Sequence, residues 1–260
     1  MRVAGRVRRK SLLYKTDVEY GDYTMNHVLG CAHGCKYPCY AFMMKKRFGI
    51  VHTYEEWLRP YLVENTIELL DQEIPRLRDK IESVHLCFTT DPFMHQYQEI
   101  HQMSMDAIKR LNRDEIKCTV LTKGRLPIEL ADCYEKNEYG ITLVSLTEAY
   151  RRRMEPHAAK LKDRLASLEA LHDKGCHTWV SIEPYPTPNL VKQELSTLLE
   201  AVSFTDRIIF GRTNYSTEVT AYTGHKDFYN ECAQEVIEFC EARDIQYHIK
   251  DGTLTNINAE

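Results

Sequence analysis

Three cysteines in one short loop are the residues of this sequence whose type and spacing most clearly indicate chemistry. Cys31, Cys35 and Cys39 stand in the segment GCAHGCKYPCYAF, residues 30–42, with three residues between each pair. Thiolates at this density are typical of a metal centre in a reducing compartment. The total of nine cysteines is odd and the other six are scattered, so the sequence does not indicate a disulfide framework.

Three thiolates in one loop fit more than one kind of metal centre. A structural zinc site takes four protein ligands, and no second cysteine pair follows at a suitable spacing; His33 is the one imidazole inside the loop. A zinc ion with three cysteines and a water stays open as an alternative, although the His-x-Glu of zinc deaminases is absent from the loop. A [4Fe–4S] cluster held by three thiolates keeps one iron free for a small molecule, which would explain why there are three cysteines.

The composition is that of an ordinary globular chain. Of 260 residues, 43% are hydrophobic and 28% are charged. The net charge of −4 gives no overall basic field, so contact with nucleic acid would need a local patch. The first ten residues, MRVAGRVRRK, form such a patch, either as a solvated tail or as a phosphate-binding arm. They lack the apolar run of a signal peptide, and no segment has the length of a membrane span, so we expect a cytoplasmic protein without membrane contact.

Short apolar runs alternate with longer helical patterns along the chain. The helical pattern at 159–175 carries leucines at 161, 165, 168 and 171, and Gly175 is placed to end it. Further helices are expected at 54–81, 99–113, 126–137, 190–202 and 228–244. Strands are expected at 83–88, 117–122, 140–146, 177–182, 207–211 and 245–250, after a first strand at 26–30 that leads into the cysteines.

This alternation, repeated about six times, predicts βα units around a parallel sheet. We expect a partial (β/α)6 TIM-type barrel over residues 21–260 as a single domain, preceded by a basic N-terminal extension over 1–20. In parallel barrels the chemistry gathers in the loops that follow the carboxyl ends of the strands. The cysteine loop follows the first expected strand, so we expect it at that rim.

The cysteine loop also resembles the cluster loop of radical S-adenosylmethionine (SAM) enzymes, in the branch that contains spore photoproduct lyase. Loops of that branch usually have two residues between the second and third cysteines, and Pro38 is one residue more. Further segments match the branch in order: FTTDPF (88–93), LTKGRL (121–126), residues 144–175 and VSIEPYPTPN (180–189). The resemblance covers roughly residues 20–215.

The resemblance implies the cofactors and their binding residues. Cys31, Cys35 and Cys39 would hold a [4Fe–4S] cluster, and SAM would bind its fourth iron. One electron into the cluster would cleave SAM to methionine and a 5′-deoxyadenosyl radical, which implies a reductant such as flavodoxin or ferredoxin as a partner. The cofactor-binding residues implied are Tyr37, Tyr40, Thr89, Thr90, Asp91, Lys123, Ser145, Glu155 and Arg164.

Each of these residues has an expected role. The segment 89–91 offers acceptors to the SAM ammonium group, Lys123 and Arg164 offset anionic groups, and Ser145 and Glu155 bond ribose hydroxyls. Two alternatives stay open: Arg164 as a helix-surface charge, and Glu155 as a partner of the arginines at 151–153. Tyr37 and Tyr40 either pack over the cluster or the adenine, or cover apolar surface.

The substrate is the least defined part of this interpretation. In spore photoproduct lyase a cysteine directly before the Thr-Ser-Asp run donates a hydrogen atom; here Phe88 stands there, and Cys87 should point to the opposite face of the strand. We therefore do not expect thymine-dimer repair, and fold analogy favours a nucleic acid or nucleotide substrate. Candidate contacts are the segments 185–188 and 211–216, and the arginines Arg125, Arg151, Arg152, Arg153 and Arg212, although the 151–153 run fits a solvated loop equally well.

A second hypothesis belongs to a different class of protein. In it the three cysteines hold zinc or a purely redox cluster in a non-catalytic protein that binds nucleic acid or carries electrons. It predicts no SAM binding, and it predicts that Thr90, Asp91 and Ser145 can be replaced without loss of function.

Overall fold

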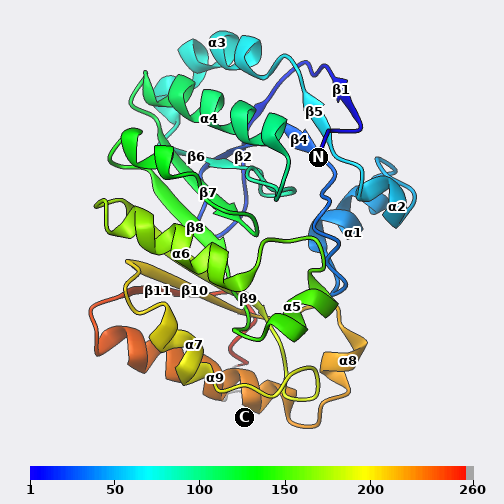
Figure 1. Ribbon diagram of the computed structural model, residues 1–260, viewed down its shortest axis with the longest axis vertical. Coiled ribbons are helices and arrows are strands. Elements are labelled where there is room, and N and C mark those ends of the chain that lie inside the picture. The colour runs from blue at the N-terminus through cyan, green and yellow to red at the C-terminus, as the bar shows by residue number, and fades with distance from the viewer. Residues whose placement is uncertain (256–260) are drawn as a thin grey trace.

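A computed structural model of the chain describes residues 1–255. Its main feature is an eight-stranded sheet in the order β11-β10-β9-β8-β7-β6-β3-β2, in which every neighbouring pair is parallel except β2 and β3. The sheet is curved and β2 and β11 are not paired with each other, so it is a partial TIM-type barrel that does not close (Figure 1). The strands are β2 (Leu13–Lys15), β3 (Tyr23–Met25), β6 (Ser83–Leu86), β7 (Lys117–Thr122), β8 (Glu138–Thr142), β9 (His177–Tyr185), β10 (Arg207–Arg212) and β11 (Gln246–Ile249).

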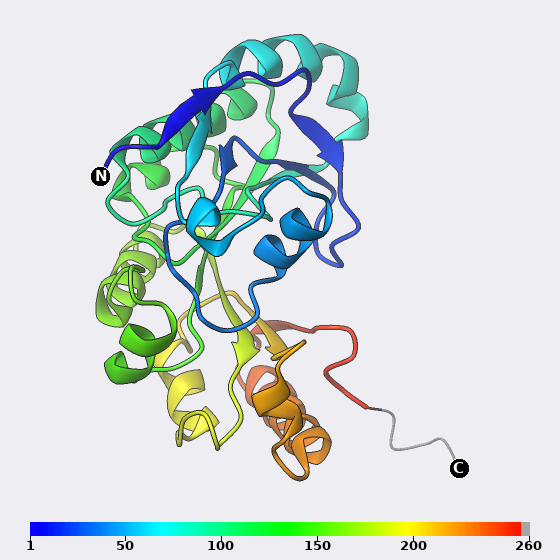
Figure 2. The ribbon, with the colours of Figure 1, turned by 90° about the vertical axis from the view of Figure 1, so that its right-hand side faces the viewer.

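Helices cover the outer face of this sheet because alternate strand residues on that face are apolar. Val84 and Leu86 of β6 and Val180 and Ile182 of β9 share one buried cluster with the apolar stripes of the helices. These outer helices are α3 (Thr66–Leu77), α4 (Gln98–Asn112), α6 (Leu161–His172), α7 (Leu195–Ala201) and α9 (His225–Glu241). Shorter helices gather at the carboxyl ends of the strands (Figures 1 and 2): α1 (Tyr40–Arg47), α2 (Tyr54–Trp57), α5 (Glu148–Met154) and α8 (Thr217–Thr220).

Aromatic rings fill part of the inner face of the sheet. His85 stacks on Phe88 with ring centroids 3.7 Å apart, and Tyr20 lies edge-on to Phe88 and to Trp179. We call these four residues the aromatic plug. Beside the plug, the Glu19 carboxylate accepts hydrogen bonds from His248 Nε2 at 2.6 Å and from the Asp251 amide at 3.2 Å. These bonds connect the segment before β3 to the β11 end of the sheet across the open side of the barrel.

The first expected strand is wrong in position. The strand that pairs with β6 is β3, which ends directly before the apolar run at 26–30. That run contains β4 (Val28–Leu29), which belongs to a separate sheet in the order β1-β5-β4 with β1 (Gly5–Val7) and β5 (Tyr61–Val63). Residues 5–7 thus pair with the fold rather than forming a frayed tail, and Arg6 and Arg8 form ion pairs with carboxylates of α4 and α3.

Two expected helices also differ from the structure. The pattern at 54–81 divides into α2, β5, α3 and a 3-10 turn, η1 (Arg78–Lys80), because Pro60 lacks the amide proton that a continuing helix needs. The segment 126–137 forms only a 3-10 turn, η2 (Ile128–Asp132). The remaining strands and helices lie within a few residues of their predicted bounds, and within residues 1–255 no helix has the length and apolarity to cross a membrane.

Candidate functional site

The cysteine loop lies at the carboxyl end of the barrel strands, between β4 and α1. Gly30 enters it with φ +82°, and a Cβ at this position would lie 2.8 Å from the Trp57 carbonyl oxygen, so the turn requires glycine. The Cys31 amide donates to that same carbonyl at 2.8 Å, and Tyr54 donates its hydroxyl proton to the Cys35 carbonyl at 2.6 Å. Cys39 is the N-cap residue of α1. Backbone contacts therefore hold the loop while all three thiols are free.

The three thiols of the loop are free, and their surroundings bear on how a metal centre could be held. Burial raises the pKa of the Cys31 thiol, with the neighbouring Cys35 adding to the shift, and burial also raises the pKa of the Cys35 thiol. Yet within residues 1–255 no three Cys, His, Asp or Glu side chains are arranged to share one metal ion. Sulfur ligands of a single tetrahedral zinc lie about 3.8 Å apart, whereas the ligands of a cluster bind separate irons.

A half-buried ammonium group lies beside the second cysteine. Lys123, which follows β7 directly, places Nζ 3.8 Å from Cys35 Sγ and 3.2 Å from Glu155 Oε1, and it donates to the Tyr37 hydroxyl. Tyr37 in turn donates its proton to Glu155 Oε1. Burial alone would lower the pKa of Lys123, but the Cys35 thiolate and Glu155 raise it more, so this lysine is charged.

Glu155 forms the centre of this charged group. Its second oxygen accepts a hydrogen bond from Arg164 at 2.6 Å, and Arg164 is completely buried, with its other nitrogens donating to the carbonyls of Thr142 and Ala159. Burial would raise the pKa of Glu155, but Lys123 and Arg164 hold it well below its usual range. Arg164 is therefore not a surface charge, and the ion-pair partners of the Glu155 carboxylate are Lys123 and Arg164 rather than the arginines at 151–153.

Asp91 stabilises the loops of the site with both carboxylate oxygens. Oδ1 accepts from the Phe93 amide at 2.9 Å and from the Thr122 hydroxyl at 2.6 Å, and Oδ2 accepts from the Lys123 amide at 2.8 Å. His33 Nδ1 lies 3.5 Å from Oδ2. Burial lowers the pKa of His33 to about 4, so this imidazole is neutral. Asp91 thus joins the cysteine loop to the ends of β6 and β7.

The remaining expected residues occupy different positions. Thr89 bonds the Asn26 side chain with its amide and its hydroxyl, and the Thr90 hydroxyl donates to the Val28 carbonyl at 3.2 Å. Ser145 is buried, and its oxygen accepts from the Thr147 amide at 3.0 Å, which leaves its hydroxyl proton free to donate. Tyr40 is 62% exposed on α1, so the structure brings Tyr37 but not Tyr40 into the group around Lys123.

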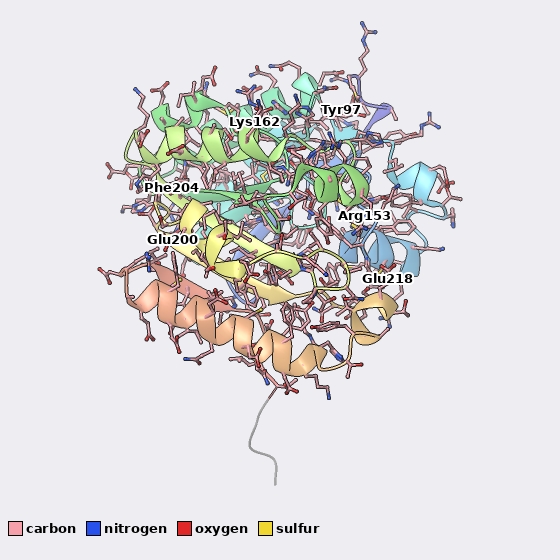
Figure 3. The ribbon with its side chains drawn as sticks, turned by 60° about the horizontal axis from the view of Figure 1, so that its bottom comes forward. Tyr97, Arg153, Lys162, Glu200, Phe204 and Glu218 are labelled. Atoms are coloured by element: carbon pink, nitrogen blue, oxygen red, sulfur yellow. The ribbon has the colours of Figure 1, made fainter. Side chains whose placement is uncertain are left out.

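The five arginines that the sequence offers as candidate substrate contacts have different surroundings in the structure. Arg151 is buried, and its guanidinium bonds Glu148 and the carbonyls of residues 155, 156 and 158, so its expected role in binding phosphate is wrong. Arg125 and Arg152 are exposed. Arg153 donates to the Leu190 carbonyl at 2.6 Å, and Figure 3 shows it on the same side of the molecule as Glu218 of α8. Arg212 bonds Asn214, and the segment 185–188 is mostly buried.

Cys87 and Phe88 lie apart, but not for the expected reason. Strand β6 ends at Leu86, and Cys87 has φ +63°, so strand alternation does not apply there. The Cys87 sulfur lies 3.4 Å from His27 Nδ1 in an apolar cluster under the small sheet, whereas Phe88 belongs to the aromatic plug.

Gly124 allows the Lys123 segment to approach the Asp91 segment, and we expect its replacement by alanine to disrupt the site. A Cβ at Gly124 would lie 1.8 Å from the Phe93 carbonyl oxygen, which is backbone and cannot rotate away. We expect Gly124→Ala to lower the free energy of unfolding by about 1–3 kcal/mol or more, as overpacking does. Urea denaturation followed by circular dichroism would measure it. Gly49→Ala is a control that meets no atom within 4 Å, but its φ of +65° costs about 1–2 kcal/mol of its own. A loss in Gly124→Ala no larger than the loss in this control would contradict the steric explanation.

Some residues of this group were not among the sequence-based candidates. Asn26 precedes the cysteine loop and fixes Thr89, Thr122 precedes Lys123 and fixes Asp91, and Tyr54 fixes the Cys35 carbonyl. Thr122 lies inside the LTKGRL segment and Asn26 begins the expected strand that leads into the cysteines, so their places in these segments were the available signal. Tyr54 had none.

The fold and this site define a class of protein. The family model of the radical SAM superfamily matches residues 25–202, and the chain belongs to that superfamily. The fold is that of spore photoproduct lyase: a structure of that enzyme with bound AdoMet and dinucleoside spore photoproduct matches with a TM-score of 0.70 at 14% identity, over 94% of this chain and 80% of the other.

Two further proteins match a smaller share of this chain. The structure of SuiB from Streptococcus suis bound to S-adenosylmethionine matches with a TM-score of 0.51 at 16% identity, over 70% of this chain and 43% of that one. An uncharacterized protein, ORF301, of Acidianus two-tailed virus is 23% identical over 188 residues, which are 69% of this chain. This chain spans 61% of the length of that viral relative.

Proposed function

We propose that the protein is a radical SAM enzyme in which Cys31, Cys35 and Cys39 hold a [4Fe–4S] cluster and SAM binds its fourth iron. With these groups bound, one-electron reduction cleaves SAM to methionine and a 5′-deoxyadenosyl radical, which takes a hydrogen atom from the substrate. The observation that carries the proposal is the half-buried ammonium of Lys123 beside a loop of three free thiols. A cation in this position offsets the negative charge that thiolates and a carboxylate bring into a buried site.

The other residues of the site position these groups. Glu155 fixes Lys123 and Arg164, and Asp91 fixes the backbone from which Lys123 projects. The Lys36 amide donates to the Met154 carbonyl at 2.8 Å, which connects the cysteine loop to α5. The free hydroxyl proton of Ser145 is available to a ribose oxygen. These contacts hold the loop before any cofactor binds and so reduce the cost of ordering it.

We propose a nucleic acid or nucleotide as the class of substrate. The similarity of fold to an enzyme that binds a dinucleoside spore photoproduct supports this class by analogy. The exposed side chains of Arg125, Arg152 and Tyr215 suit phosphates and bases. Because Phe88 stands in place of the expected hydrogen-donating cysteine, the proposal does not extend to thymine-dimer repair.

The test is SAM cleavage by the reconstituted protein. We expect anaerobically reconstituted wild type, given dithionite and SAM, to form 5′-deoxyadenosine, and Cys35→Ala to form less than about a hundredth as much, since loss of one cluster ligand removes the site for SAM. Liquid chromatography would quantify the nucleoside. Cys133→Ala, at a thiol far from the loop in sequence, is the control. An iron-loaded wild type that leaves SAM intact would favour the alternative of a binding or electron-carrying protein.

A further inference from the structure

The helix that begins at the last cysteine has an exposed face without a partner. Helix α1 buries none of its residues. We define the α1 face by the exposed side chains along and just after this helix: Tyr40, Met43, Lys46, Arg47, Phe48 and Ile50. Phe48 and Ile50 are 69% and 60% exposed, which is unusual for neighbouring large apolar residues. An apolar surface of this kind with charges at its edge is typical of a protein interface.

The charge on this face is of one sign. From residue 23 to residue 54 the sequence contains no Asp or Glu, although the whole chain has a net charge of −4. Among the described residues, neither Lys46 nor Arg47 forms an ion pair. Lys45 is half-buried, and its pKa is lowered by burial and by the nearby like charge of Arg9. Cations at a helix C-terminus suit the helix dipole, but the dipole does not explain the exposed apolar residues between and after them.

The position of the face relative to the cysteines indicates what it binds. Cys39 is the N-cap residue of α1, so the face begins at the residue next to a cluster ligand. In Figure 2, α1 lies at the front of the molecule, at the open end of the barrel, and the chain segment that leads into it runs in front, below the helix. Tyr40, an exposed residue of the face, is covalently adjacent to Cys39.

We propose that the α1 face is the docking surface for an acidic protein that donates single electrons, such as a flavodoxin. This inference rests on the proposed function, because only a reducible cluster needs such a donor. At this surface the donor loses one electron and the cluster gains it, and no covalent bond is formed or broken. Complementary charge speeds the encounter, and the apolar side chains supply the contact area. Tyr40 and Phe48 of the face can stack on bases, whereas Met43 and Ile50 cannot, so binding of a single-stranded oligonucleotide is the competing outcome that the test includes.

The test compares two sources of electrons in the same reconstituted protein. Dithionite is small and needs no docking surface, whereas reduced flavodoxin does. We expect Lys46→Glu/Arg47→Glu to cleave SAM at the wild-type rate with dithionite, and to show a KM for reduced flavodoxin raised roughly tenfold at low salt. The difference should shrink as added salt shortens the Debye length to about 10 Å at 0.1 M. The double variant Lys162→Glu/Lys174→Glu makes the same change in charge at exposed positions of α6 and the turn after it, and should keep the wild-type KM.

Each other outcome overturns this inference in an identifiable way. An unchanged KM for flavodoxin in the α1 variant overturns it directly. An equal loss of rate with dithionite means that the two residues support the site itself. Loss of binding to a single-stranded oligonucleotide, with the KM for flavodoxin unchanged, assigns the face to nucleic acid. If the wild type cleaves no SAM with dithionite, the proposed function fails, and that result is separate from any effect of the α1 substitutions.

Discussion

Replacing Glu155 with glutamine is expected to lower the free energy of unfolding by about 3–5 kcal/mol, because it leaves the buried charges of Lys123 and Arg164 without their common carboxylate. Urea denaturation of the metal-free protein at pH 7 would measure the loss. Glu200→Gln is the matched control, because the Glu200 side chain is 58% exposed in its ion pair with Arg243, and such pairs are worth at most about 1 kcal/mol. Similar losses in the two variants would contradict the buried charge network.

The same substitution predicts a pH dependence. The pKa of Glu155 is depressed in the folded protein, so its contribution is complete above the unfolded carboxyl value of about 4.3 and is lost as the pH falls towards the folded value. We therefore expect the stability difference between wild type and Glu155→Gln to be constant from pH 7 to about pH 5 and to narrow below about pH 4. A difference that stays constant down to pH 3 would show that Glu155 titrates normally in the folded state.

Replacing Lys123 with methionine is expected to reduce dithionite-driven SAM cleavage by about two orders of magnitude, because the site loses its cation at the position where anionic charge gathers. Methionine keeps much of the side-chain length without the charge. A cation near a cluster ligand favours the reduced state, so the cluster potential should also become more negative in this variant. Redox titration followed by electron paramagnetic resonance would measure it.

Lys117→Met is the control for this prediction. Lys117 begins the same strand, forms an ion pair with Glu138 and lies at the opposite end of β7 from the cysteine loop. We expect wild-type potential and near-wild-type cleavage in that variant. Equal iron content with an unchanged potential in Lys123→Met would mean that Lys123 acts only as a structural partner of Glu155.

The elements that bury alternate or helically spaced apolar residues were predictable from the sequence. Strand β7 has the predicted bounds, 117–122, because its β-branched run is flanked by polar residues at both ends. Helices α1 and α5 were not predicted because α1 buries nothing, and the short α5 buries only Tyr150 and Met154 as apolar residues and carries three consecutive arginines. The apolar run at 26–30 was taken for the first barrel strand because periodicity does not tell which of two sheets a short run joins.

The motifs that form the site were predictable from the sequence, but the contacts between their side chains were not. The positions of the three cysteines and of Lys123 after a strand follow from local sequence. The burial of Arg164 against Glu155 depends on how α6 packs beside β8, and Arg164 differs from an exposed helix arginine only in three dimensions. Asp91 was expected to receive a ligand, whereas its oxygens are taken by three protein donors from neighbouring loops.

The aromatic plug limits the direction from which a reactant can arrive. Tyr20, His85, Phe88 and Trp179 lie against one another inside the curved sheet and so give it a floor. With the floor in place, a reactant has to enter through the mouth formed by the loops after the strands. A short-lived radical generated there would be shielded from solvent on the floor side. The lifetime of such a radical would then depend on how completely the substrate itself seals the mouth.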